Sequence, residues 1–336
     1  VLLCAVTFPT IVPTTLLATE PGGEKKILLI GHELDHAWGT HMYLPTCQML
    51  AKCLMQTPGV NAIVSDGWPK KKAVLEGIDA LVLYSSPGGE ILLDGAEAGE
   101  VDRLMKQGVG LVCIHWATGL KKENEERLGE KWMNTLGGMW LHFVGLKIDD
   151  SELQQLNPEH PVCNGWAEYE LNDEFYLNTQ VAPGSETLLQ VEVDGNKVPV
   201  AWAFERPISK GGRSFGTTLG HFHRNFKIEA FRRMIVNAIL WAAHVQLPLG
   251  GAPVAVTEDD HAKFEAALAA HKQRHHIDFK RIEEKVEAAE RNPHTPFHER
   301  YANVSVAEWD ALRLRWLTYW SRYVLDHCEY PSFANS

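Results

Sequence analysis

The chain has 336 residues, of which 45% are hydrophobic and 22% are charged, a balance typical of a globular protein with a large core. Acidic residues outnumber basic ones by 43 to 32, which gives a formal net charge of −11. This excess argues against a general nucleic-acid or anionic-membrane binder, because such surfaces need clustered lysine and arginine. The six cysteines form no C-x-x-C pair, so neither a zinc ribbon nor a thioredoxin-type redox site is indicated.

Residues 1–18, VLLCAVTFPTIVPTTLLA, are apolar and uncharged, and the polar stretch TEPGGEKK follows them. This pattern is typical of the apolar region of a secretory signal peptide. We therefore expect residues 1–23 to be a signal-peptide remnant and linker, and the protein to be periplasmic or secreted; a misassigned start would instead favour a cytoplasmic location. We expect no membrane span in the mature protein, because no second long apolar run occurs.

Apolar, β-branched runs alternate with amphipathic stretches from residue 25 to residue 119. The predicted strands are 25–31, 61–67, 79–86 and one at the start of 109–119 with a loop after it, and the predicted helices are 41–56 and 92–108. Continuous apolar strands that alternate with helices indicate a parallel sheet covered on both faces. The sequence therefore predicts an α/β fold with a doubly wound, mostly parallel sheet.

The pattern changes near residue 141, after which strands follow one another with few helices between them. The predicted strands lie in 141–149, 186–195, 198–205 and 213–221, and a strongly amphipathic helix covers 225–245. Pro248 and Gly250 follow that helix and end the pattern. We expect one α/β domain over residues 24–250.

Residues 251–336 form a helical C-terminal extension in this interpretation. Charge-rich helical patterns cover 258–292 and 305–327, and Ser305 with Glu308 matches a capping box. We expect these helices to fold back on the core or to dock a partner, which includes a second copy in a homo-oligomer.

Residues 32–36 read His-Glu-Leu-Asp-His and match the H-E-x-x-H pattern of zinc metallopeptidases. In those enzymes the two histidines bind one metal because residues i and i+4 share a helix face. Here the five residues directly follow the apolar run 25–31, which ends in glycine. The pattern therefore predicts a loop at the carboxyl end of the first strand, and not a metallopeptidase helix.

Ligands of open parallel sheets bind beyond the carboxyl ends of the strands. In this chain, histidines, aromatic rings and hydroxyl groups follow three of the predicted strands. They are His32, His36 and His41 after the first strand, Tyr84, Ser85 and Ser86 after the third, and His115 and Trp116 after the fourth. We expect these side chains to form a histidine-rich site at one edge of the sheet.

Several motifs resemble those of the ThuA-like family, which is named for trehalose utilisation. They are ILLIGHELDHAWGTH (27–41), GVGLVCIHWATG (108–119), TLGGMWLHF (135–143), NPEHPVCNGW (157–166), NDEFY (172–176) and TTLGHFHRNF (217–226), in the family's order. The resemblance covers roughly residues 25–245 and leaves out the C-terminal extension. It implies a fold similar to that of the class I glutamine amidotransferases, which is flavodoxin-like.

Class I amidotransferases carry a catalytic cysteine on the tight turn after a sheet strand. In this chain the comparable turn carries His115, and Cys113 lies two residues earlier, within the predicted strand. Glutamine hydrolysis needs an exposed, activated thiolate. We therefore do not expect glutamine amidotransferase activity.

The resemblance implies a role in the metabolism of trehalose and related disaccharides, alongside oxidoreductases that form 3-keto sugars. We expect an enzyme that cleaves, eliminates or isomerises a glycoside or 3-keto-glycoside, because a 3-keto group acidifies the adjacent C–H bond. The expected catalytic residues are His115 and His32 as base and electrophile, and Glu174 and Asp173 as carboxylates that orient an imidazole or accept the proton. The residues expected to bind the saccharide are Trp38, His36, Trp116, Trp140, Tyr176, His142, His221 and His223.

A divalent metal such as zinc is a second hypothesis for the same place. His32, His115, His221 and Glu174 offer the three imidazoles and one carboxylate that such an ion accepts, although nothing in their spacing demands it. Three alternatives stay open: a non-catalytic carbohydrate-binding or scaffold protein on an inactive amidotransferase-like fold, a metal-dependent hydrolase of another polar substrate, and an interaction protein that docks a partner through its C-terminal helices.

Overall fold

The computed structural model describes residues 23–264, except 33–34, 37–38, 87, 143 and 208, and also residues 266, 284–286, 288, 291 and 304. Three expectations fall outside these residues: the signal-peptide remnant up to residue 22, the role of Trp38, and most of the helical C-terminal extension. In the part of the chain that the structure describes, no helix has the length and apolar character needed to cross a membrane.

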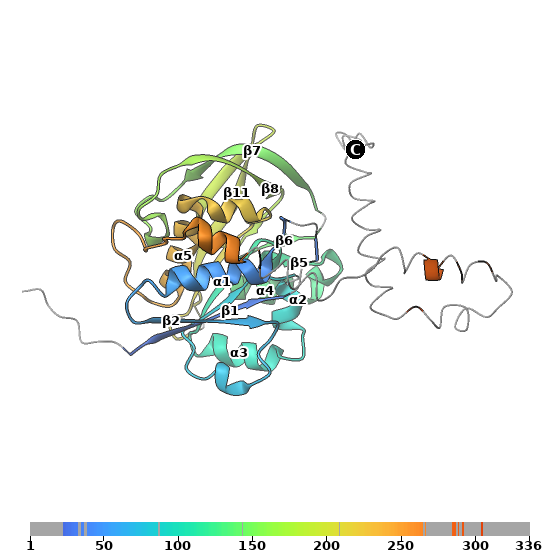
Figure 1. Cartoon of the computed structure of the whole chain (residues 1–336), viewed down its shortest axis with the longest axis horizontal. Helices are drawn as coiled ribbons and strands as arrows, with labels where there is room; N and C mark the ends of the chain where they lie inside the picture. Colours follow the sequence, from blue (N-terminus) through green and yellow to red (C-terminus); the bar gives the residue numbers. More distant parts are fainter. Residues whose placement is uncertain are drawn as a thin grey trace, which may run out of the picture.

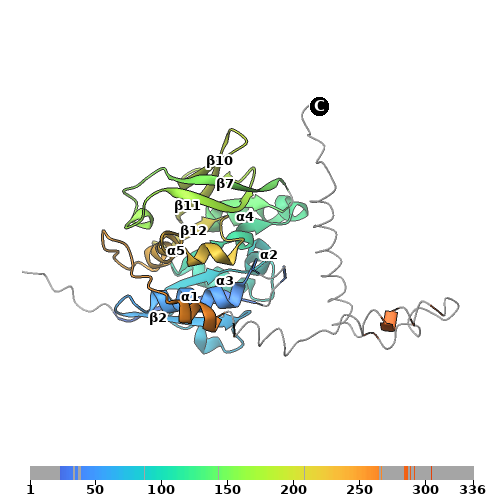
Figure 2. The ribbon, with the colours of Figure 1, turned by 45° about the horizontal axis from the view of Figure 1, so that its top comes forward.

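A nine-stranded sheet forms the centre of the molecule (Figure 1). In spatial order its strands are β2 (Val60–Asp66), β1 (Lys25–Gly31), β3 (Ala80–Leu83), β4 (Gly110–Ile114), β12 (Arg213–Thr217), β11 (Asn196–Glu205), β10 (Glu186–Val193), β7 (Leu146–Gln155) and β8 (Tyr169–Tyr176). The five strands from β2 to β12 run parallel to one another, and we call them the parallel half. The other four strands, β11, β10, β7 and β8, pair antiparallel and form the antiparallel half, which Figure 2 shows at the opposite end of the sheet from β2.

Helices cover both faces of the parallel half. They are α1 (Tyr43–Leu54), α2 (Gly88–Leu93), α3 (Ala98–Lys106), α4 (Glu125–Leu136) and α5 (Glu229–Ala242). Ile27 and Leu29 of β1 belong to the core that α1 and α5 cover, whereas Leu28 and Ile30 belong to the core that α2, α3 and α4 cover. Successive residues of a strand point to opposite faces. Burial on both faces therefore explains why residues 25–31 read as a continuous apolar run, and the doubly wound α/β prediction is confirmed.

Shorter elements connect these layers. A small second sheet contains β5 (Gly119–Leu120), β6 (Gly138–Leu141) and β9 (Gln180–Val181), and the 3-10 helices are η1 (Lys72–Val74), η2 (His115–Thr118), η3 (Lys122–Asn124), η4 (Pro161–Cys163) and η5 (His223–Lys227). The sequence patterns do not predict β8. Its residues, YELNDEFY, include three acids and an asparagine, which are depleted in strands.

Residues 251–264, which we call the strap, lie against the same core as α1. Ala252 and Val254 are buried members of that core. The Gln56 side chain donates to the Ala255 carbonyl at 2.8 Å and accepts from the Ala255 N–H at 3.0 Å. Lys52 of α1 forms an ion pair with Asp260. The strap therefore helps to hold α1 on the sheet.

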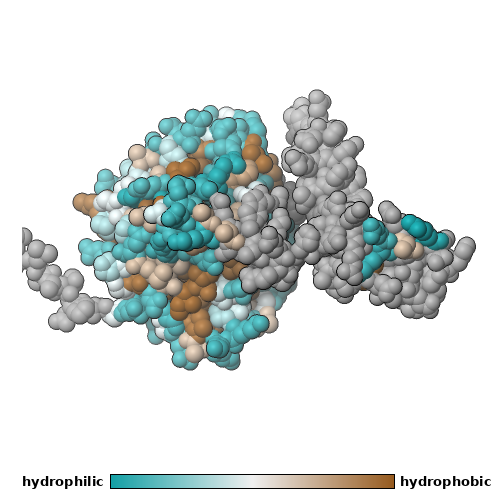
Figure 3. All heavy atoms as spheres, viewed as in Figure 1, coloured by the Kyte–Doolittle hydropathy of each residue, from teal (hydrophilic) through white to brown (hydrophobic). Residues whose placement is uncertain are grey.

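The surface of the described residues is mainly hydrophilic on the face that Figure 3 shows, with apolar side chains in separate patches. The large exposed hydrophobic residues are Met55, Ile148, Leu156, Ile228 and Leu249. They come from different elements, and single exposed apolar residues of this kind are normal for globular proteins.

Candidate active site

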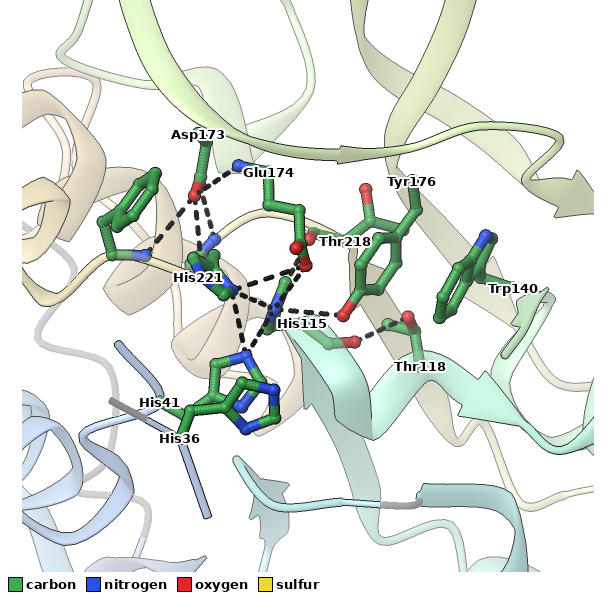
Figure 4. A network of polar contacts seen from close by, with 12 residues as sticks. His36, His41, His115, Thr118, Trp140, Asp173, Glu174, Tyr176, Thr218 and His221 are labelled. Atoms are coloured by element: carbon green, nitrogen blue, oxygen red, sulfur yellow. Dashed lines mark hydrogen bonds and ion pairs between the residues drawn. The ribbon is translucent and has the colours of Figure 1, made fainter. Parts of the chain in front are cut away.

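Three histidines follow three strands of the parallel half at its carboxyl edge (Figure 4). His41 lies between β1 and α1, His115 directly follows β4, and His221 follows β12. A fourth residue, Glu174, comes instead from within β8 in the antiparallel half. This edge of the sheet is where open α/β sheets bind ligands.

The ring nitrogens of the three histidines and one oxygen of Glu174 converge. His41 Nε2 lies 2.9 Å from His115 Nε2 and 3.0 Å from His221 Nδ1, and the last two atoms are 3.3 Å apart. Glu174 Oε2 lies 3.4 Å from His221 Nδ1 and 3.6 Å from His115 Nε2. All four atoms lie within 4.8 Å of one another. We call these four residues the imidazole–carboxylate cluster.

Two of these histidines have a backbone in the left-handed region, with φ of 47° at His41 and 56° at His115. Such a conformation costs a non-glycine residue about 1–3 kcal/mol and is found preferentially at functional sites. At His115 the turn is held partly by Thr118, whose hydroxyl donates to the His115 carbonyl at 2.7 Å. The sharp turn after β4 therefore directs the His115 ring toward the cluster.

Hydrogen bonds set the tautomers of two rings. His115 Nδ1 lies 2.7 Å from the carbonyl oxygen of Thr218, which only accepts, so Nδ1 carries the proton and Nε2 carries a lone pair. His41 Nδ1 lies 3.1 Å from the carboxylate oxygen Oδ1 of Asp35 and likewise donates. Tyr43 donates to the other oxygen of Asp35 at 3.1 Å. Both Nε2 atoms therefore present lone pairs to the cluster.

Asp173 holds the loop that carries His221. Its carboxylate accepts the backbone N–H groups of Gly220 at 2.7 Å, His221 at 3.1 Å and Phe222 at 3.4 Å. Gly220 has a φ of 109°, which favours glycine, and its carbonyl accepts the Tyr84 hydroxyl at 2.5 Å. The Asp173 carboxylate is thus bound to backbone and does not belong to the cluster, although Glu174 next to it does.

Backbone contacts join the loops of His41 and His221. The His41 N–H donates to the His221 carbonyl at 3.1 Å, and the His223 N–H donates to the Gly39 carbonyl at 2.9 Å. Thr40 and Phe222 form an isolated antiparallel bridge between these two bonds. These contacts fix the relative positions of two of the three imidazoles.

Burial controls the charges of the cluster. It lowers the pKa of His41 to about 4 and also lowers the pKa values of His115 and His221. It raises the pKa of Glu174 to about 8, and the neighbouring charge of Asp173 adds to this shift. At neutral pH the three imidazoles are therefore uncharged, and the cluster lacks positive charge.

Two buried aromatic rings border the cluster. The Tyr176 hydroxyl lies 3.0 Å from His115 Nε2, and its ring stacks on that of Trp140 with centroids 3.9 Å apart. Trp116 is partly exposed; it contacts the His36 ring edge-on at 4.8 Å and stacks on His142 at 5.2 Å. Of these rings, Trp116 is the one that a substrate can reach from outside.

The structure brings together several of the residues expected from the sequence. His115, His221 and Glu174 meet in the cluster, and Tyr176 contacts it. His36 lies beside it, with its ring centroid 3.7 Å from that of His41.

Other expected residues lie elsewhere. His32 is not among the four donors; the Ser86 N–H donates to its Nε2 at 3.4 Å, and its ring lies 4.6 Å from that of Tyr43. His223 points to α1, where its Nδ1 is 3.0 Å from the Thr46 hydroxyl.

The described residues of the H-E-x-x-H segment are not helical, as predicted. His32 and His36 therefore do not share a helix face, and the metallopeptidase interpretation has no support. His41 takes the place that the metal hypothesis gave to His32. The sequence analysis placed His41 at this edge without making it a metal ligand, and it missed Asp35. No spacing rule distinguishes either residue from its neighbours in the same loop.

Cys113 lies inside β4 and is fully buried, and burial raises the pKa of its thiol. His115 occupies the turn after the strand. The cysteine therefore cannot act as an exposed thiolate. Its position within the strand agrees with the sequence-based prediction.

The family model ThuA, described as trehalose utilisation, matches residues 27–242. A ThuA-like protein from Bacteroides uniformis has a similar structure, with a TM-score of 0.51 and 19% identity over 67% of this chain and 93% of that one, a likeness that shows the fold alone. The match to a glutamine amidotransferase from Thermotoga maritima, with a TM-score of 0.41 and 9% identity over 66% of this chain and 100% of that one, is too distant to support an inference. No curated protein matches the sequence significantly.

Proposed function

Because the chain belongs to the ThuA family, described as trehalose utilisation, we propose that it is an enzyme of carbohydrate metabolism that acts on a 3-keto-glycoside. The observation that carries this proposal is the convergence of three imidazoles and a carboxylate at the carboxyl edge of the sheet. Buried groups with shifted pKa values are concentrated at catalytic sites. All four cluster residues lie within the matched region, so the family description and the site concern the same part of the chain.

The proposed reaction is an elimination. The carbonyl at C3 of the sugar acidifies the hydrogen on C2, and a base removes that proton. The C1–O bond then breaks, its electrons leave with the oxygen, and that oxygen takes up a proton to form an alcohol. One glycoside gives one unsaturated keto sugar and one alcohol, without an oxidant or a reductant. We propose that the cluster binds the sugar oxygens around C3.

His36 is the proposed base. Its side chain is 34% exposed, and its Nδ1 lies 2.9 Å from Asp35 Oδ1. In the neutral ring Nδ1–H donates to this carboxylate, which leaves the lone pair on Nε2 to accept a proton. A carboxylate that orients an imidazole in this way is a common arrangement for general bases. This assignment gives the base role to His36 in place of His115. The His115 ring is buried, and both of its nitrogens already have polar contacts within the protein.

Trp116 is the proposed sugar-binding ring. It is partly exposed and lies beside His36. The apolar face of a sugar ring can pack on an indole while its hydroxyl groups reach the cluster.

The test is an assay of the full-length protein with 3-ketotrehalose, with trehalose as the unoxidised comparison. We expect 3-ketotrehalose to release glucose and an unsaturated keto sugar, detected by mass spectrometry, and trehalose to stay intact. In deuterated water, recovered substrate should carry deuterium at C2 if proton removal is reversible. His36→Ala and His115→Ala should lose turnover, and His160→Gln, whose ring contacts Trp241 away from the cluster, should keep it.

Two outcomes would contradict the proposal. Saccharide binding without product release would favour a carbohydrate-binding or scaffold protein. Turnover restricted to esters, amides or phosphates would favour a hydrolase of another polar substrate.

A further inference from the structure

We infer that His41, His115, His221 and Glu174 bind one zinc-class divalent metal ion as three imidazole ligands and one carboxylate ligand. The inference rests on the site of the proposed function and deepens it. It adds His41, which the sequence places at the same sheet edge but which the metal hypothesis from the sequence did not include.

The distances between donor atoms fit one ion. Zinc–nitrogen and zinc–oxygen bonds of about 2.0–2.1 Å in a tetrahedron place neighbouring ligand atoms about 3.3 Å apart. Five of the six separations within the cluster are 2.9, 3.0, 3.3, 3.4 and 3.6 Å, and the sixth, between His41 and Glu174, is no more than 4.8 Å. Side chains from four separate elements thus present their donor atoms at the spacing of a single coordination sphere.

A hydrogen bond does not account for the contact between His41 Nε2 and His115 Nε2. His41 Nε2 and His115 Nε2 both carry lone pairs, because Asp35 and the Thr218 carbonyl bind the opposite ring nitrogens. Two lone pairs 2.9 Å apart repel unless a cation lies near both. A divalent ion removes the repulsion.

The outer partners are those that metal-binding histidines usually have. Such histidines donate their second ring N–H to a carboxylate or a backbone carbonyl, which fixes the tautomer and the ring orientation. Asp35 does this for His41, and the Thr218 carbonyl does it for His115. The third imidazole, on His221, is positioned through its backbone, which bonds to Asp173 and to the loop of His41.

The donor set selects the class of metal. Magnesium and calcium prefer oxygen ligands, whereas three imidazoles with one carboxylate suit zinc and its neighbours in the transition series. Glu174 makes the longest contacts in the cluster, and its side chain is 14% exposed while that of His115 is fully buried. Glu174 is therefore on the more open side of the cluster. A bound ion would supply a Lewis acid for a sugar carbonyl.

The test measures metal binding and not activity. The full-length protein is purified without tag or chelator, and its zinc, manganese, iron, cobalt and nickel contents are measured by elemental mass spectrometry. It is then stripped with a chelator and titrated with Co²⁺. We expect about one equivalent of metal and the intense visible absorption of tetrahedral Co²⁺.

Variants locate the ion. Metal should be lost from His41→Ala, His115→Ala and His221→Ala, and retained by the control His160→Gln, all checked by circular dichroism. Asp35→Asn leaves the ligands in place and should weaken Co²⁺ binding by about 10- to 100-fold, the usual cost of an altered outer partner. The Co²⁺ titration uses the wild-type protein alone. It therefore tests metal binding even if an alanine variant misfolds.

Failure of this inference differs from failure of the proposed function. A wild-type protein that binds no zinc or Co²⁺, or a folded His115→Ala variant that keeps one equivalent, overturns the metal site. Turnover of 3-ketotrehalose by the stripped protein would leave the proposed function standing without a metal. A bound metal without any turnover would leave the metal site standing and overturn the proposed function.

Discussion

The parallel and antiparallel halves of the sheet contribute to the cluster in different ways. The parallel half supplies three imidazoles from loops that follow β1, β4 and β12, where the chain leaves the sheet. The antiparallel half supplies a carboxylate from within β8, a strand at the edge of the sheet. The three imidazoles lie beyond the ends of their strands, whereas Glu174 lies within β8 and must be presented while β8 pairs with β7. The site is therefore assembled from loop residues of one half and a strand residue of the other.

The largest expected effect concerns the cluster residues that the two halves supply. His115→Ala removes a group of the parallel half and should lower kcat/KM for 3-ketotrehalose by about 10²–10³-fold, as loss of a preorganised electrostatic group does. Glu174→Gln keeps the shape of the side chain but replaces the acid by an amide that cannot ionise, which should cost about 10–100-fold. Equal losses in steady-state kinetics would contradict this difference between the halves.

Removing the strap shows how far the stability of the parallel half depends on contacts from outside the sheet. A chain that ends at residue 250 loses the burial of Ala252 and Val254 and two hydrogen bonds to Gln56. We expect its free energy of unfolding, measured in urea, to fall by about 3 kcal/mol or more relative to a chain that ends at residue 264. Equal stability of the two truncated proteins would show that the strap does not hold α1.

Asp173 connects the two halves, because it lies on β8 and its carboxylate binds the loop that follows β12. Replacing it therefore measures how much this connection contributes to stability. Asp173→Asn replaces an acceptor by a donor opposite backbone N–H groups, and should lower the free energy of unfolding by about 1–3 kcal/mol. The control is Asp149→Asn on β7, the partner of Asp173 in the strand register, whose more exposed side chain pairs with Lys147. We expect the control to change stability by less than about 0.5 kcal/mol. A cost as large as that of Asp173→Asn would refute the special role of the buried carboxylate.

The smallest expected effect is on pH dependence where the antiparallel half meets α5. Burial lowers the pKa of His160, whose ring contacts Trp241 of α5. A histidine with a lowered pKa in the folded state binds fewer protons than in the unfolded state, so its contribution to stability is lost as the pH falls below about 6.5. Between pH 7.5 and 5.5 the wild type should therefore lose more stability in urea than His160→Gln does. A parallel decline in both proteins would exclude His160 as a cause.

Much of the fold could be predicted from short-range pattern. The run at 25–31 becomes β1 with the predicted bounds, and the predicted helix over 225–245 contains α5. In the parallel half, burial on both faces demands apolar residues at consecutive positions, so the sequence carries a strong signal. β8 has no such signal, because it lies at an edge and half of its residues are polar.

The cluster was predicted in part for the same reason. His115 follows an evident buried strand, so its place at the sheet edge could be predicted from the chain. His32 and His41 follow the same strand, and only the backbone contacts between residues 39–41 and 221–223 decide which ring turns inward. Asp173 and Glu174 are adjacent carboxylates, and only the arrangement of the 220–222 loop separates the positioning group from the cluster member.

The sequence by itself determined the doubly wound α/β fold, the family, and the edge of the sheet at which the histidines gather, because hydrophobic periodicity and the alternation of strands and helices along the chain are properties of neighbouring residues. Only the tertiary structure decided which side chains meet. Residues 41, 115, 174 and 221 are far apart along the chain, and their donor atoms converge through left-handed turns and backbone hydrogen bonds that no local pattern encodes. The selection of His41, and with it the candidate metal site, is therefore a result of packing between loops.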